Sequence, residues 1–108
     1  MNTTPVVLRP QAESDVDEAV AYYEQNADAE VALRFVDALN RAYAQIVASP
    51  GLGSPRYTHV LKFPGLRHRP LARFPHLIFY IAQSDHLDIV RVLHSARDIP
   101  TWVTEPDA

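Results

Sequence analysis

The spacing of hydrophobic residues divides the chain into a helical first half and a second half made of strands. Residues 5–9 form a short β-branched run that ends at Pro10, which predicts a strand. Apolar positions then recur every three or four residues across 11–25 and again from about 29 to 48, which predicts two amphipathic helices. Because residues 26–28 form so short a link, we expect the two helices to lie antiparallel as a hairpin.

The second half of the chain follows a loop rich in proline and glycine at 49–55. Residues 66–72 look extended, but Pro70 has no backbone N–H to donate, so this strand belongs at an edge or carries a bulge. Residues 76–82 are apolar on both faces and predict a central strand. After a turn, residues 87–94 return as its hairpin partner.

This order of elements predicts an α+β fold. It consists of an N-terminal strand, an antiparallel helical hairpin and then a three-stranded antiparallel sheet, with the hairpin packed on one face of a mostly antiparallel sheet. A chain of 108 residues can bury one core, so we expect a single domain over 1–108 with a frayed tail at about 104–108. Trp102 either pins that tail to the sheet or contacts a partner.

The amino-acid composition excludes several classes of protein. Hydrophobic residues make up 47% and charged residues 21%, as in ordinary globular proteins. The chain has no cysteine, which excludes disulfides and thiol nucleophiles. No apolar run approaches the roughly 20 residues of a membrane span, and the N-terminus lacks the pattern of a secretory signal. We therefore expect a cytoplasmic protein that makes no membrane contact.

Charge is distributed unevenly. Residues 1–54 carry eight acidic and three basic side chains, whereas residues 55–108 carry five acidic and seven basic ones, and nine of the ten basic residues are arginine. Two readings stay open: the halves balance each other within the fold, or the second half presents a basic surface to a partner.

The histidines do not have the spacing of a metal site. All five lie eight to ten residues apart, and no pair has helical i,i+4 spacing, although His76 and His94 can become neighbours across the predicted hairpin. Residues 51–53 form only a Gly-x-Gly, and no Gly-x-Ser-x-Gly is present. We expect neither a metal nor a cofactor.

Two segments near the C-terminus carry a resemblance to a known family. Residues 73–80 read Arg-Phe-Pro-His-Leu-Ile-Phe-Tyr, and residues 90–100 contain His-Ser-Ala-Arg-Asp-Ile-Pro. This pair resembles the C-terminal strands of the ParE branch of the RelE/ParE toxin superfamily, and residues 8–12 and Tyr22–Tyr23 look similar too. The resemblance implies the toxin of a type II toxin–antitoxin pair that serves plasmid stabilization and is neutralised by an antitoxin from the same operon.

The resemblance also implies a target. RelE-like members cleave messenger RNA on the ribosome, whereas ParE-like members inhibit DNA gyrase without nuclease activity. RNA cleavage by the 2′-hydroxyl needs a base, an acid and cations. Here His76 or Leu77 occupies the strand position that is arginine in RelE-like enzymes, and Trp102 and Val103 lie near the place of their C-terminal tyrosine. We therefore expect a gyrase inhibitor that is not an enzyme and does not itself recognise a nucleic-acid sequence.

Candidate residues follow from these two targets. The contacts to gyrase are predicted near the last strand and the tail, at Arg91, Arg97, Asp98 and Trp102, although Arg97 and Asp98 can equally form an ion pair that closes the strand. The alternative ribosome-dependent endoribonuclease would use Arg73, His76, His94 and Arg97. A third hypothesis is a non-toxic relic that only binds its antitoxin.

The antitoxin is predicted to use surface that the hairpin leaves open. Because the chain looks too short to cover both faces of its sheet, we expect an antitoxin segment to dock apolar residues against the helices and to add backbone contacts near the edge at 66–72. The basic stretch 56–97 should attract acidic antitoxin residues and make association salt-dependent.

Overall fold

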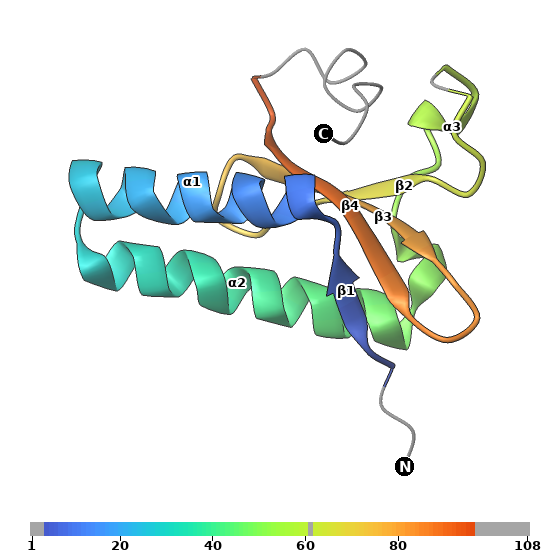
Figure 1. Ribbon diagram of the computed structural model, residues 1–108, viewed down its shortest axis with the longest axis horizontal. Helices are drawn as coiled ribbons and strands as arrows, with labels where there is room; N and C mark the ends of the chain where they lie inside the picture. Colours follow the sequence, from blue (N-terminus) through green and yellow to red (C-terminus); the bar gives the residue numbers. More distant parts are fainter. Residues whose placement is uncertain (1–3, 61, 97–108) are drawn as a thin grey trace.

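The computed structural model describes residues 4–60 and 62–96, and these form one mixed sheet with a helical hairpin (Figure 1). The strands lie in the order β1-β4-β3-β2, with β1 parallel to β4 and the other pairs antiparallel. This confirms the predicted α+β fold. In chain order the elements are β1 (Val6–Leu8), α1 (Pro10–Asn26), α2 (Ala29–Ala48), the 3-10 turn η1 (Pro50–Leu52), α3 (Tyr57–Val60), β2 (Arg67–Pro70), β3 (His76–Ala82) and β4 (Leu87–His94).

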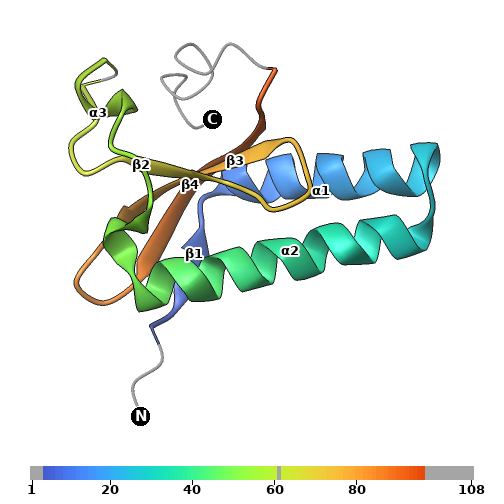
Figure 2. The same ribbon diagram turned by 180° about the vertical axis from the view of Figure 1, so that it is seen from behind.

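The two helices lie antiparallel on one face of the sheet (Figures 1 and 2). Pro10 stands in the first turn of α1, where the missing N–H costs nothing. The carboxylate of Asp28 accepts a hydrogen bond of 2.9 Å from the backbone N–H of Val31 and so caps α2. The apolar stripe of α2 supplies much of the main core, through Ala32, Phe35, Leu39, Ala42, Tyr43 and Ile46.

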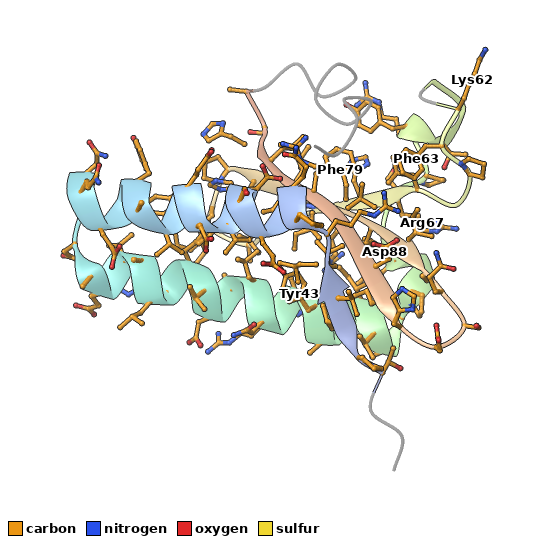
Figure 3. All side chains as sticks on the ribbon, in the orientation of Figure 1. Tyr43, Lys62, Phe63, Arg67, Phe79 and Asp88 are labelled. Carbon is orange, nitrogen blue, oxygen red and sulfur yellow. The ribbon has the colours of Figure 1, made fainter. Side chains whose placement is uncertain are left out.

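The opposite face of the sheet carries a second, smaller core. Phe79 and Leu93 from the central strands are buried there, and Tyr57 and Phe63 from the segment around α3 pack against them (Figure 3). The expectation that the chain is too short to cover this face was therefore wrong for the part that carries Phe79 and Leu93. The segment between η1 and β2 folds back over it, and the short helix α3 within that segment was not predicted.

β2 is an edge strand, as Pro70 predicted, but its outer side is already occupied. Ser54 exchanges two backbone hydrogen bonds with His68, of 2.8 and 2.9 Å. The N–H of Leu66 donates to the carbonyl of Phe63 at 3.2 Å, and Pro70 has no N–H. Arg67 and Arg69 point their backbone groups toward β3, because bonding alternates along an antiparallel strand. No N–H of β2 is left to receive a partner strand, which corrects the expected docking at 66–72.

The hydroxyl of Tyr80 ties the loop after α2 to the sheet. It accepts a hydrogen bond of 2.8 Å from the N–H of Gly53 and donates one of 2.7 Å to the carbonyl of Pro50. A Cβ at Gly53 would lie 2.5 Å from this hydroxyl and 2.8 Å from the carbonyl oxygen of His68, so the close approach requires glycine.

Tyr80→Phe should therefore lower the free energy of unfolding by about 1–3 kcal/mol, because it leaves the buried N–H of Gly53 and the partly buried carbonyl of Pro50 without a partner. Urea denaturation measures this loss. Tyr22→Phe is the matched control, since Tyr22 is 59% exposed and should change stability by less than about 0.5 kcal/mol. Equal effects of the two substitutions would contradict the role of the Tyr80 hydroxyl.

Candidate functional site

The two sequence motifs meet at one end of the sheet, beside α1. The first residues of β3 and the last residues of β4 line a cleft of about 640 Å³ there, and α1 forms its other wall. The charged and ring-bearing side chains that line the cleft come from three elements, and they include Asp15, Glu18 and Tyr23 of α1, His76 of β3, and Arg91 and His94 of β4.

Arg91 is held in a buried ion pair with Asp15. Its Nε and Nη2 atoms donate to the two carboxylate oxygens at 2.8 and 2.9 Å, and the N–H of Val92 donates to the same carboxylate at 3.0 Å. The side chains of Arg91 and Asp15 are 4% and 10% exposed. The pair joins α1 to β4, so the predicted contact of Arg91 with a target would require the pair to open, and it stays a prediction.

A β-bulge keeps Arg91 out of the main core. Phe79 pairs with Arg91 but Tyr80 pairs with Ile89, so Val90 is an extra residue in β4. Strict alternation from Ile89 would place Arg91 beneath the helices, where instead Val92 joins the main core. The bulge thus accommodates an arginine within a buried strand, with its charge paired to the carboxylate of Asp15 on α1.

A second arginine pair lies near the start of β4. Arg9, directly after β1, donates from Nε and Nη2 to the carboxylate of Asp88 at 3.1 and 2.9 Å. Its guanidinium also lies 5.7 Å from the ring centre of Phe63. Together the two pairs attach the N-terminal elements to β4 at two points.

His76 and His94 are direct cross-strand partners, with ring centres 5.4 Å apart, which confirms that the hairpin makes them neighbours. His76 is 7% exposed, and its ring lies 4.9 Å from that of Phe35. Burial, and secondarily the neighbouring His94, lowers the pKa of His76 to about 4, although Asp15 acts in the opposite direction. His76 is therefore neutral at pH 7.

The described residues do not assemble the predicted nuclease set. The Nδ1 atom of His76 is buried and has no hydrogen-bond partner in the described part of the chain, whereas the Nδ1 atom of exposed His94 accepts from the N–H of Ala96 at 3.0 Å. Arg73 lies on the turn before β3 and lines a different groove, next to α2. The structure thus brings His76 and His94 together but leaves Arg73 apart.

Three predicted target contacts, Arg97, Asp98 and Trp102, lie outside the described residues. Within 4–60 and 62–96, no group of three or more metal-ligating side chains could hold a metal ion. In the same part of the chain, no helix is long and apolar enough to cross a membrane.

Comparison with known proteins gives the family. A family model described as the ParE toxin of the type II toxin–antitoxin system ParDE matches residues 6–99. The chain belongs to the ParE toxin family. A solved structure from the chromosomal ParDE toxin–antitoxin system of P. aeruginosa matches with a TM-score of 0.68 and 20% identity, over 84% of this chain and 95% of that one. At that identity the likeness concerns the fold. No curated protein matches the sequence.

Asp15 is the residue of this ParE-family site that sequence reasoning missed. Its position in an acidic stretch near the start of α1 indicates at most a favourable interaction with the helix N-terminus. Its partner, Arg91, stands 76 positions away. No local pattern signals such a pair, although a lone arginine inside an apolar strand does indicate that a buried acid is needed somewhere.

Proposed function

We propose that this ParE-family toxin acts in the cytoplasm by inhibiting DNA gyrase and that an antitoxin from its own operon neutralises it. The choice of gyrase over RNA rests on one observation, the burial of the His76 side chain, which is 7% exposed and whose pKa burial lowers. A base that helps the 2′-hydroxyl attack must reach the substrate and works best with a pKa near the working pH. Although His76 lines the cleft, only 7% of it is exposed and its pKa is lowered to about 4, so it suits the role of a general base poorly.

The test is induction of the toxin without its antitoxin, with separate readouts of DNA damage and of messenger RNA. We expect DNA breaks and an SOS response without ribosome-phased RNA cuts, and loss of supercoiling when the purified protein is added to purified gyrase. Prompt RNA cuts without an SOS response would instead support the endoribonuclease. Normal growth together with intact antitoxin binding would identify the non-toxic relic.

Substitution of His76 separates the two mechanisms further. His76→Phe places a ring of similar size beside Tyr23 and Phe35 but cannot transfer a proton. We expect growth arrest to persist, whereas loss of a catalytic histidine costs about 10²–10⁴-fold in rate. Circular dichroism and antitoxin binding report on folding. Growth arrest abolished in a folded, antitoxin-binding variant would overturn the gyrase proposal.

A further inference from the structure

A second groove runs along α2, away from the histidine cleft. It has a volume of about 700 Å³ and lies between α2 and the residues that lead from β2 into β3. Four of its lining side chains are arginines, and only one is a carboxylate, that of Asp37. The four arginines come from two separate parts of the chain: Arg34 and Arg41 from α2, Arg69 from β2 and Arg73 from the following turn.

Two of these arginines have no acidic partner in the described part of the chain. Arg69 donates only to the neutral side-chain oxygen of Gln45, at 3.3 Å. Arg73 is exposed and makes no hydrogen bond or ion pair with another described residue. It also has a φ of 68°, a left-handed conformation that costs an arginine more than a glycine.

The two arginines of α2 are held only by exposed partners on their own helix. The Nη2 atom of Arg34 lies 2.7 Å from Oε1 of Glu30, and the Nη2 atom of Arg41 lies 3.7 Å from Oδ2 of Asp37. All four side chains are more than 60% exposed. Such i,i+4 pairs stabilise a helix by about 0.3–0.5 kcal/mol. The two arginines can therefore leave these partners for the carboxylates of a binding partner at little cost in free energy. The groove therefore offers four guanidinium groups to an anionic ligand.

The floor of the groove is apolar. Ala42 and Leu71 are buried, and Phe74 packs at the margin of the main core. The small side chains of Ala38 and Ala42 leave room above the helix for the side chains of a partner. An apolar floor with a cationic rim suits a peptide segment that carries carboxylates beside apolar anchors.

A nucleic acid suits this groove less well. A phosphate backbone has no apolar side chains to place on Ala42 and Leu71. Moreover, the hairpin that forms one wall belongs to the acidic half of the chain, in which eight acidic residues face three basic ones. A long polyanion would meet those charges, whereas a short acidic segment would lie within the groove.

We propose that this groove docks an acidic amphipathic segment of the antitoxin, with its carboxylates on Arg69 and Arg73 and its apolar side chains on the floor. The inference rests on the proposed neutralisation by an antitoxin. It also redirects the expected docking from the edge of β2, whose N–H groups are occupied, to the groove beside it.

The test measures binding of the antitoxin, expressed from the reading frame beside the toxin gene, by isothermal titration calorimetry. Arg69→Glu combined with Arg73→Glu should weaken binding about 10- to 100-fold. Arg56→Glu combined with Lys62→Glu is the matched control, because it changes the net charge equally outside the groove, and Lys62 points away from the fold (Figure 3). The control should change the affinity less than threefold, and equal melting temperatures would show that both variants fold.

Each other outcome has a distinct meaning. If the wild type binds antitoxin and the groove variant binds equally well, the groove proposal is wrong while the proposed function stands. If the wild type binds no antitoxin at all, the proposed neutralisation itself fails. Binding to a fluorescein-labelled 20-base-pair duplex DNA is measured in parallel. If the groove variant binds the antitoxin as the wild type does but no longer binds this DNA, the groove is a nucleic-acid site and the peptide proposal is overturned.

Discussion

Replacing Asp15 by alanine should lower the free energy of unfolding by about 3–5 kcal/mol, a large share of the stability of a domain this size. The substitution removes the carboxylate that accepts two hydrogen bonds from the buried guanidinium of Arg91 and one from the N–H of Val92. Equilibrium denaturation by urea, monitored by far-ultraviolet circular dichroism, measures the loss.

Two further variants show whether burial causes this effect. Glu30→Ala breaks an exposed pair with Arg34 and should cost less than about 0.5 kcal/mol. Asp15→Leu combined with Arg91→Met removes both charges and should recover most of the lost stability, because an apolar pair of similar volume needs no counter-ion. A cost below about 1 kcal/mol for Asp15→Ala would mean that Arg91 finds water or another acid when Asp15 is absent.

Acidification from pH 6.5 to pH 4 should remove about 3 kcal/mol of stability through His76 alone. The pKa of His76 is about 4 in the folded protein and 6.5 as the ordinary value, so the unfolded chain binds a proton that the folded chain does not. The contribution is fully present above pH 6.5 and is lost as the pH falls toward 4. The physical cause is the charge that protonation would place beside Phe35 and Tyr23.

Comparison with His76→Phe isolates this contribution. Urea denaturation of both proteins across pH 4–7 should give curves that diverge below pH 6.5, with the wild type losing stability faster. His68, whose pKa burial also lowers, remains in both proteins, so its effect cancels in the difference. Parallel curves would show that the imidazole of His76 reaches water in the folded state.

The regular elements were predictable because their signals are local. The apolar stripe of α2 and the Asp28 cap define a helix over 29–48, and the bounds of β3 and β4 matched the predicted strands. Pro70 placed β2 at an edge through a single missing N–H. The C-terminal motifs carried the resemblance to the ParE family, which the match over residues 6–99 bears out.

The second core and the occupied edge of β2 were not predictable, because they depend on how an irregular segment folds back. Nothing in the spacing of residues 53–66 shows that Ser54 will bond to His68 or that Phe63 will cover Phe79. Loops lack the periodicity that reports burial, so their contacts appear only when the whole chain is in place.

By itself the sequence determined the order and type of the elements and the family, since these depend on periodicity, on proline and on short motifs. Only the tertiary structure decided which charges are buried and which remain available. Arg91 is sequestered by an aspartate 76 positions away, His76 is kept neutral by aromatic neighbours from α1 and α2, and Arg69 and Arg73 are left facing a groove. Burial and pairing are properties of surfaces assembled from distant segments, and no local pattern encodes them.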